Sequence, residues 1–287
     1  MKNTLRICLT HDIDRLKKTY QYITHDLRRL NWKGFKPLFA GPEPYWQLEN
    51  MAELETRYGV KSTIFFLHET IPFAPLNPKN WKLSAGRYSL EAPHIKRIIR
   101  WLDENGWEVG LHGSFLSYKD ESLLKQEKDI LEQLLGHEIQ GIRQHYLNLT
   151  EPDTWQLQKR AGFIYDASLG RTDGIGYLDE RQKPFIQKDT GMAIIPLTLM
   201  ECYLFADAGN SKEKALQLAL SWMDHAMENN LVYTILWHQR MFNETDFPGY
   251  RWVYEEIIKE AQSRNAKFIT CGEIAKDLTL ENKPDRS

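Results

Sequence analysis

The chain has 287 residues, of which 42% are hydrophobic and 26% are charged, and its formal net charge is −2 at pH 7. These fractions are typical of an ordinary globular protein, and the small net charge gives no whole-chain signal for nucleic acid, so we expect no nucleic-acid partner. The three cysteines, Cys8, Cys202 and Cys271, are odd in number and far apart, which argues against a disulfide framework or a cysteine-based zinc site. The N-terminus reaches its acids before an apolar stretch of signal-peptide length develops, so we expect a cytoplasmic protein.

Apolar runs of strand length alternate with helical patterns along the chain. The expected strands cover residues 5–10, 61–67, 108–112, 193–197, 231–238 and 266–270, and the expected helices cover 46–57, 92–105, 119–136, 151–161, 212–229 and 250–264. Strands that alternate with helices predict βα units around a parallel sheet or barrel. Because no repeat, low-complexity tract or Gly/Ser linker divides the chain, we expect one domain over residues 1–287.

Two long connections interrupt this pattern, at residues 15–45 and 71–91. We expect the first to hold a basic helix followed by a Gly/Pro turn, and the second to be a loop rich in Pro and Asn. Loops of this length inside a compact domain are usually functional or disordered. The basic helix could meet a pyrophosphate or an anionic membrane surface, or it could be a solvated face. Its cations are Arg15, Lys17, Lys18, Arg28 and Arg29.

Polar side chains suited to chemistry collect at the ends of the expected strands. Asp12 and Asp14 follow the first strand, His112 ends the third, residues 143–146 follow the stretch HEIQGI, and His238 ends the fifth. In βα folds the carboxyl ends of the strands form the active site. Two acids spaced two apart on an extended chain point the same way and repel unless a positive group such as a metal lies beside them. Alternatively, the strand has ended and the acids are solvated or cap a helix.

Five motifs in order decide between these alternatives: THDID, GVKSTIFFL, NGWEVGLHGSF, GIRQHYL and LWH. Together they resemble the polysaccharide deacetylase family, carbohydrate esterase family 4, from Thr10 to about Cys271. The resemblance implies a distorted (β/α) barrel in a single α/β domain. It also implies hydrolysis of acetyl groups on sugars, with a divalent metal held by one Asp and two His.

The first motif resembles the spaced form in which one acid is the general base and the next a metal ligand. The resemblance therefore assigns the base to Asp12 and a ligand to Asp14. This division is chemically sensible, because a carboxylate on a metal is pinned while its neighbour stays free to accept a proton.

His112 in GLHGSF matches the first histidine of the second motif, although a histidine at a strand end can also be purely structural. An Asp and a neutral imidazole suit zinc, our first choice of metal, and similar divalent ions. The family has a second histidine four residues on, where this chain has Leu116, which cannot bind a metal. Three alternatives follow. Another side chain supplies the third ligand, a water molecule completes the site, or the protein binds no metal. Our candidate for the third ligand is His145 in GIRQHY.

Three further roles follow from the resemblance. Arg143 would hold the base carboxylate in place, unless it only forms a surface salt bridge, and the backbone N–H of Tyr146 would be the oxyanion donor. His238 would protonate the leaving group, a task suited to imidazole because its ordinary pKa lies near neutrality. Glu201 also sits at a strand end, after the run IIPLTLM, without matching a motif.

The function that these motifs predict is removal of an acetyl group from an N-acetylated sugar of a surface polysaccharide or its cytoplasmic precursor. The partner would be an acetylated sugar or glycan, with possible peripheral contact to a lipid-linked substrate. Two alternatives stay open. One is a metal-independent amide or ureide hydrolase on the same fold, which the missing second histidine makes credible. The other is a non-catalytic carbohydrate-binding protein.

Overall fold

The computed structural model describes residues 4–27, 30, 32–35, 37 and 42–281. Its strands are β1 (Arg6–Ile13), β2 (Thr63–Leu67), β3 (Glu108–Gly113), β4 (Gly141–Gln144), β5 (Tyr165–Asp166), β6 (Phe185–Ile186), β7 (Ala193–Ile194), β8 (Leu199–Met200), β9 (Val232–Leu236) and β10 (Lys267–Phe268). Its α-helices are α2 (Leu48–Arg57), α3 (Pro78–Ser84), α4 (Pro93–Glu104), α5 (Glu121–Leu135), α6 (Asp153–Arg160), α7 (Glu201–Asp207), α8 (Lys212–Glu228), α9 (Tyr250–Ser263) and α10 (Cys271–Glu281). Each expected helix therefore has a counterpart, while α3, α7 and α10 were not expected.

One curled sheet holds these strands in the order β6-β7-β5-β4-β3-β2-β1-β9-β8, and β10 also pairs with β1. The pairs are parallel except for β6 with β7. Along the described residues the order is open, with β6 at one end and β8 at the other, so the sheet forms a half-barrel. The α/β fold predicted from the alternating pattern is confirmed, with the barrel distorted to the point of being open.

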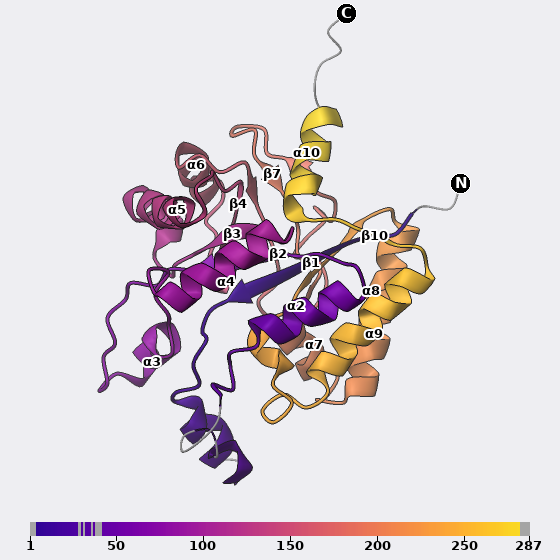
Figure 1. Ribbon diagram of the computed structural model, residues 1–287. Coiled ribbons are helices and arrows are strands. Elements are labelled where there is room, and N and C mark those ends of the chain that lie inside the picture. Colours follow the sequence, from indigo (N-terminus) through magenta and orange to yellow (C-terminus); the bar gives the residue numbers. More distant parts are fainter. Residues whose placement is uncertain (1–3, 28–29, 31, 36, 38–41, 282–287) are drawn as a thin grey trace, which may run out of the picture.

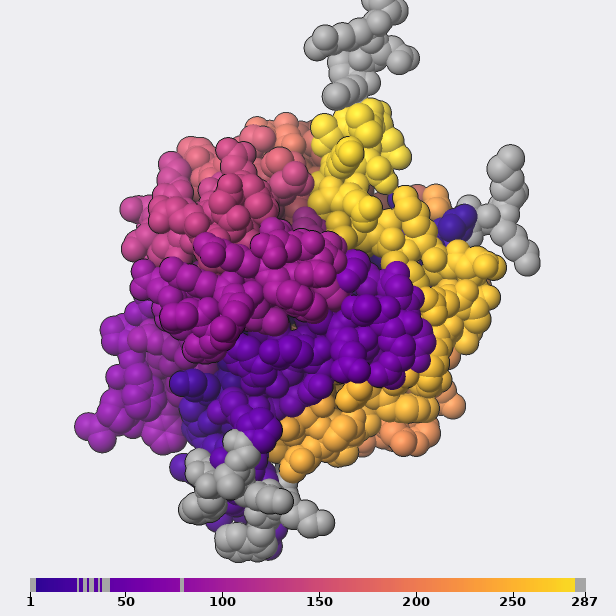
Figure 2. Space-filling model, viewed as in Figure 1, coloured from indigo at the N-terminus to yellow at the C-terminus, as the bar shows by residue number. Residues whose placement is uncertain are grey.

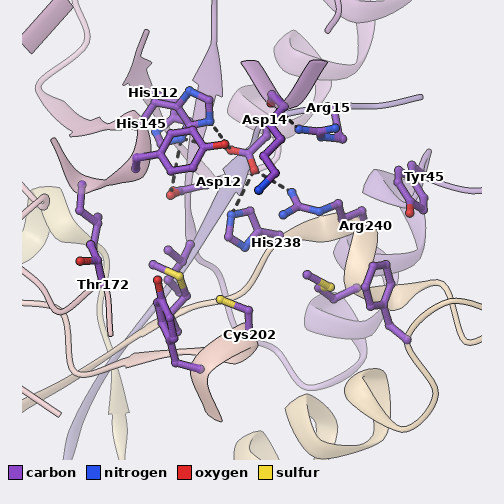
Figure 3. A pocket seen from close by; sticks show the side chains of 18 of the residues that line it. Asp12, Asp14, Arg15, Tyr45, His112, His145, Thr172, Cys202, His238 and Arg240 are labelled. Carbon is purple, nitrogen blue, oxygen red and sulfur yellow. Dashed lines mark hydrogen bonds and ion pairs between the residues drawn. The ribbon is translucent and has the colours of Figure 1, made fainter. Parts of the chain in front are cut away.

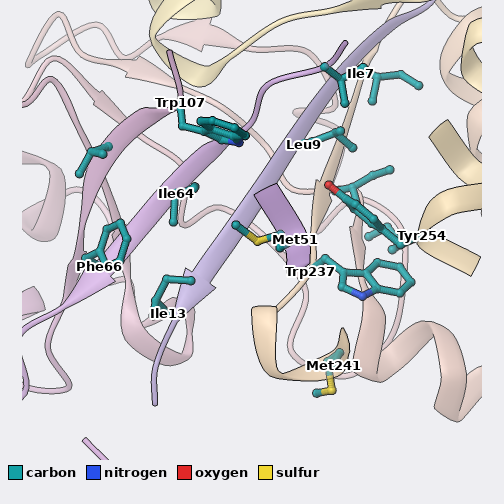
Figure 4. Packing of buried hydrophobic residues seen from close by; sticks show 14 of the residues in the cluster. Ile7, Leu9, Ile13, Met51, Ile64, Phe66, Trp107, Trp237, Met241 and Tyr254 are labelled. Atoms are coloured by element: carbon teal, nitrogen blue, oxygen red, sulfur yellow. The ribbon is translucent and has the colours of Figure 1, made fainter. Parts of the chain in front are cut away.

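Side chains on alternate positions of β1 divide between the two faces of the sheet, as expected for an extended strand. Ile7, Leu9 and Ile13 face the surrounding helices and belong to the main hydrophobic core. Figure 4 shows them with Met51 of α2 and Tyr254 of α9, which pack against the same face. The helices thereby cover the outside of the sheet (Figure 1).

The opposite face of β1 carries Cys8, Thr10 and Asp12, which are all buried inside the curl of the sheet. Cys8 belongs to a smaller apolar cluster that closes the base of the half-barrel. Along this face the side chains change from apolar Cys8 to polar Thr10 and then to acidic Asp12, toward the carboxyl end of the strand. This alternation carries the carboxylate of Asp12 to the inner face of the sheet.

The first strand is longer than the sequence pattern indicated. We expected it to end at residue 10, but it continues to Ile13, and Asp12 is paired in register with Phe65 of β2. The alternative was that the strand has ended and both acids are solvated. It is wrong for Asp12, which lies within the strand and is only 2% exposed. An acid is tolerated inside this strand because its charge is paired with a buried arginine, described below.

The basic helix expected within residues 15–45 does not form over its first cations. Residues 15–19 are irregular, and the described residues that follow include a helical turn at residues 21–27, π-helical over Tyr22–Leu27, and a 3₁₀ turn, Trp32–Phe35. The ammonium of Lys18 lies 2.6 Å from Asp26 and 2.7 Å from Asp246, so this cation is neutralised inside the fold. Arg28 and Arg29 lie outside the described residues.

The two long connections pack against each other on the side where β1 ends. The rings of Tyr20 and Trp81 lie 6.5 Å apart, and Arg15 donates a hydrogen bond to the carbonyl oxygen of Lys82. Figure 2 shows the indigo and purple atoms of these connections side by side on the lower part of the molecule. Of the helices in the described ranges, none is long and apolar enough to cross a bilayer.

Candidate active site

A pocket of about 630 Å³ opens at the carboxyl ends of strands β1, β3, β4 and β9. Its lining includes six of the residues that the sequence predicted for the site, namely Asp12, Asp14, His112, His145, Tyr146 and His238. Parallel strands bring their carboxyl ends to one edge of the sheet, which is why residues more than 200 positions apart meet here. Figure 3 shows Asp14 near the centre of these side chains.

Asp12 is paired with Arg143, as the sequence predicted. Arg143 Nη1 donates to Asp12 Oδ1 over 3.1 Å and to Thr10 Oγ1 over 2.7 Å, and its Nε donates to the Ala167 carbonyl oxygen over 2.9 Å. The guanidinium also lies over the ring of Phe65, 4.7 Å from its centroid. Because Arg143 is fully buried, the interaction is a pocket-side ion pair and the surface salt bridge alternative is wrong.

Asp14 lies just beyond β1 and contacts nitrogen atoms on several sides. Its Oδ1 is 3.2 Å from His112 Nε2, and its Oδ2 is 2.7 Å from Arg240 Nη1 and 3.3 Å from His238 Nε2. Burial alone would raise the pKa of Asp14, but His238 and Arg240 hold that pKa well below its usual value. The carboxylate is thus ionised and available as a ligand.

Ligand atoms of Asp14, His112 and His145 all lie within 4.8 Å of one another. His112 turns Nδ1 to the Arg143 carbonyl oxygen, 2.9 Å away, which leaves Nε2 directed at Asp14. The rings of His112 and His145 meet edge to face with centroids 5.2 Å apart. The structure thereby brings together the three side chains that the sequence put forward as metal ligands.

Behind His145 lies a carboxylate that sequence reasoning missed. Glu69 Oε2 is 3.9 Å from His145 Nδ1, and this carboxylate accepts hydrogen bonds from the backbone N–H groups of Ile71 and Phe115. Burial raises the pKa of Glu69, but His145 and these N–H groups lower it to a net value below normal. Burial lowers the pKa of His145, which favours the neutral imidazole that metals bind.

His238 is held by a second carboxylate. Its Nδ1 lies 2.6 Å from Glu201 Oε1 at the start of α7, while Nε2 faces Asp14 and the pocket. Burial lowers the pKa of His238, but Glu201 and Asp14 outweigh it, and the pKa rises to about 9. Glu201 therefore orients His238, with one ring nitrogen directed at the pocket.

Two further positions of the motifs, Tyr146 and Leu116, differ from each other in their relation to the pocket. Tyr146 has φ 59° and ψ 18°, a left-handed conformation that costs a non-glycine residue energy and that is concentrated at functional sites. Leu116, where the resemblance implies a histidine, is 40% exposed and absent from the lining of the pocket. Leu116, at the position of the missing histidine, lies outside the pocket lining. His145 instead approaches Asp14 from the end of β4.

The sequence analysis did not name Arg240 or Glu69 as candidate site residues. Both obey the strand-end rule, since Glu69 follows β2 and Arg240 follows β9. The rule was applied to His68 and His238, one or two positions earlier. His68 is not among the residues that line the pocket. Strand-end position was therefore an available signal, but it does not tell which of two neighbouring polar residues turns inward.

Comparisons of sequence alone find no relative: no family model and no curated protein matches the chain. Solved structures do match. A crystal structure from Mycobacterium smegmatis described as a polysaccharide deacetylase has a TM-score of 0.65 at 16% identity, covering 100% of this chain and 94% of that one. Another so described, from Pseudomonas aeruginosa PAO1, has a TM-score of 0.62 at 17% identity, covering 97% and 92%.

The chain has the polysaccharide deacetylase fold. The Puue allantoinase matches nearly as well, with a TM-score of 0.64 at 14% identity over 98% of this chain and 92% of that one. The polysaccharide deacetylase fold thus extends to proteins of more than one activity, and at these identities the likeness concerns the fold alone. The side chains in the pocket must carry the argument about chemistry.

Proposed function

We propose that the protein is a metal-dependent hydrolase that removes an acetyl group from an N-acetylated sugar of a surface polysaccharide or its cytoplasmic precursor. The observation that carries the proposal is the convergence of three units on one pocket. These are the Asp12–Arg143 pair, the cluster of Asp14 with two histidines, and the His238–Glu201 pair. General base, metal ligands and general acid are the parts that amide hydrolysis needs.

The donor set fits a divalent metal, and zinc best. Asp14 Oδ1 is buried without a hydrogen-bond partner, and it faces His112 Nε2, whose ring is anchored through the other nitrogen. A carboxylate and two imidazoles are usual protein ligands of a catalytic zinc site, and His112 is anchored through its other nitrogen. Such an ion would polarise the acetyl carbonyl and acidify a water molecule. Asp14, His112 and His145 would hold it.

We assign to Asp12 the role of accepting the proton of the attacking water. Its Oδ1 is held by Arg143, while Oδ2 lies 3.8 Å from His112 Nε2 and so faces the ligand cluster. The water oxygen adds to the acetyl carbon, and we assign to the developing oxyanion the backbone N–H of Tyr146, whose backbone is left-handed. Full turnover in an Asp12→Asn variant would contradict the role of Asp12.

We assign to His238 the role of returning a proton to the leaving nitrogen. The C–N bond then breaks, acetate is released, and the sugar keeps a free amine. Glu201 orients the ring through Nδ1, so Nε2 is the atom that faces substrate. The size of the pocket, about 630 Å³, is in the range that encloses small ligands such as a sugar unit.

The test of this proposal combines metal content with acetate release. Protein purified without chelator should carry about one equivalent of a divalent metal, and it should release acetate from N-acetylated sugars. We expect His112→Ala and His145→Ala to lose both metal and activity. His137→Ala is the matched control, because His137 also contacts a carboxylate, Asp103, but lies at the surface away from the pocket.

Loss of metal with His112→Ala alone would remove His145 from the ligand set. Acetate release that persists after complete removal of metal would favour the metal-independent amide or ureide hydrolase. That alternative rests on the likeness to an allantoinase and on the missing histidine at position 116. The approach of His145 to Asp14 weakens the second reason, because it completes a set of three ligand side chains.

A further inference from the structure

Within the part of the chain that the structure describes, Arg15 is a buried cation without a counter-ion. It follows Asp14 directly, its residue is 8% exposed, and it lines the pocket. Its Nη2 donates to the Lys82 carbonyl oxygen over 2.8 Å and its guanidinium lies 5.3 Å from the centroid of the Tyr20 ring, whereas Nη1 is buried without a partner. No carboxylate among the described residues forms an ion pair with it.

This arrangement is an exception within the protein. The other buried cations of the described chain each have a carboxylate partner, namely Asp246 for Lys18, Glu132 for Lys128 and Asp12 for Arg143. Burying a guanidinium without a counter-charge costs free energy, because the lost hydration is not replaced by an ion pair. A chain that neutralises its other buried cations and leaves one unpaired at a pocket indicates that the missing anion comes from the ligand.

The charges around Arg15 point the same way. Lys82 and Arg240 line the same pocket, and the two acids of its lining are already engaged, Asp12 by Arg143 and Asp14 by Arg240. Figure 3 shows Arg15 and Arg240 together on one side of Asp14, away from Thr172. That side of the pocket therefore has an excess of positive charge beside the atoms proposed to react.

We propose that Arg15, assisted by Lys82 at the rim, binds an anionic group of the substrate, so that the acetylated sugar carries a carboxylate or a phosphate close to the acetamido group. This inference rests on the proposed function and names its substrate class. A guanidinium binds both anions well, because its fork of N–H donors matches two oxygens at once. The anion would be either a uronic acid carboxylate of the sugar or the phosphate of a nucleotide-linked or lipid-linked precursor.

Binding of deacetylated sugars tests the anion site without turnover. The probes are glucosamine, the anomeric phosphate of glucosamine, and the corresponding aminouronic acid, measured by calorimetry on wild-type protein, Arg15→Gln and Lys17→Gln. Lys17 is the matched control, because it lies two residues away, is exposed, and loses the same charge. Arg15→Lys keeps the charge without the fork and should show an intermediate preference.

We expect the wild-type protein to bind at least one anionic sugar about tenfold or more tightly than glucosamine. Arg15→Gln should lose that preference while its affinity for glucosamine stays unchanged, and Lys17→Gln should keep the preference. Preference for the phosphate identifies a nucleotide-linked or lipid-linked substrate, and preference for the carboxylate identifies a uronic acid. Equal affinity for all three probes, absence of binding by both anions, or equal losses in the Arg15 and Lys17 variants would overturn the inference.

Acetate release from the N-acetylated forms of the same sugars separates this inference from the proposed function. Acetate released without any preference for an anion would leave the hydrolase standing and remove the anion site. An anion preference that depends on Arg15, with no acetate released, would keep the anion site and remove the hydrolase. A thermal unfolding scan of Arg15→Gln shows whether the protein remains folded after the hydrogen bond from Arg15 to the Lys82 carbonyl oxygen is lost.

Discussion

The two faces of strand β1 carry polar side chains in opposite surroundings. On the outer face, His11 is fully buried with Nε2 2.8 Å from Glu55 and Nδ1 against the Trp237 carbonyl oxygen. Glu55 also accepts hydrogen bonds from Tyr254, Trp107 and Ser62. We refer to His11, Glu55, Ser62, Trp107 and Tyr254 as the closed cluster. Its carboxylate oxygens are all paired, and none of its members lines the pocket.

On the inner face and just beyond it, the pocket keeps buried polar atoms without partners. They include Asp14 Oδ1 and Arg15 Nη1. Buried polar groups in proteins are nearly always hydrogen-bonded, so the unpartnered atoms of Asp14 and Arg15, two residues that line the pocket, are available to a ligand. One strand thus supports both a structural histidine and a candidate catalytic carboxylate, at neighbouring positions. His11 and Asp12 differ in the face of the strand that they occupy and in whether protein groups alone satisfy their surroundings.

The largest expected effect is on turnover, from the pocket side. His238→Gln should lower kcat for acetate release by about 10²–10⁴-fold, because the amide can still donate to Glu201 but cannot transfer a proton. His137→Gln, which changes a surface histidine paired with Asp103, should leave kcat unchanged. Steady-state acetate measurements check this, and comparable losses in both variants would contradict the assignment.

The closed cluster should show the reverse behaviour. Glu55→Ala removes the acceptor of four donors and should lower the free energy of unfolding by about 3–5 kcal/mol, with kcat of the surviving folded protein unchanged. Tyr254→Phe removes one donor and should cost about 1 kcal/mol. Urea unfolding measures both. A fall in kcat that exceeds the loss of folded protein would show that the cluster acts on the pocket.

The carboxylate behind His145 offers a smaller effect. Glu69→Gln should weaken metal affinity by about 10–100-fold, because the imidazole loses the carboxylate that orients it, and activity should recover at saturating metal. Glu127→Gln is the matched control, since Glu127 is also a buried carboxyl next to the β3 end but accepts from the Ser114 N–H. Competition with a chromogenic chelator measures the affinities. Equal weakening in both variants would exclude a specific role for Glu69.

The smallest effect concerns Glu127 itself, a buried carboxyl that belongs to neither the closed cluster nor the lining of the pocket. Burial raises the pKa of Glu127 to about 8, with a further contribution from Glu69. Between an unfolded pKa of about 4.3 and this value the folded protein holds a proton that the unfolded chain releases, so stability falls as pH rises. Gln mimics the protonated form without titrating.

The stability of Glu127→Gln relative to wild type should therefore increase by roughly 1 kcal/mol from about pH 5 to about pH 6. Urea unfolding at both pH values checks the sign. An advantage of the Gln variant that stays constant with pH would mean that Glu127 is ionised in the folded protein throughout this range. The comparison with Glu55 is direct, since burial raises the pKa of Glu55 but His11 brings it to a net value below normal.

Much of the scaffold followed from local sequence patterns. The helices from α2 to α9 that the pattern predicted begin and end within a few residues of the expected bounds, because their apolar spacing is a local property. The short strands β5, β6 and β8 were not predicted, since two-residue strands exist only through their neighbours in the sheet. The same holds for the extension of β1 to Ile13, which depends on pairing with β2 and on Arg143.

By itself the sequence determined the strand ends that carry Asp12, Asp14, His112, Arg143 and His238, because parallel βα units always bring these ends to one edge. Only the tertiary structure decided that His145 turns toward Asp14, and that Glu69 stands behind it. It also separated the expected basic helix into a neutralised Lys18, an exposed Lys17 and an unpaired Arg15 at the pocket. The physical reason is that the direction and charge pairing of a loop side chain depend on segments distant in sequence, which no local pattern encodes.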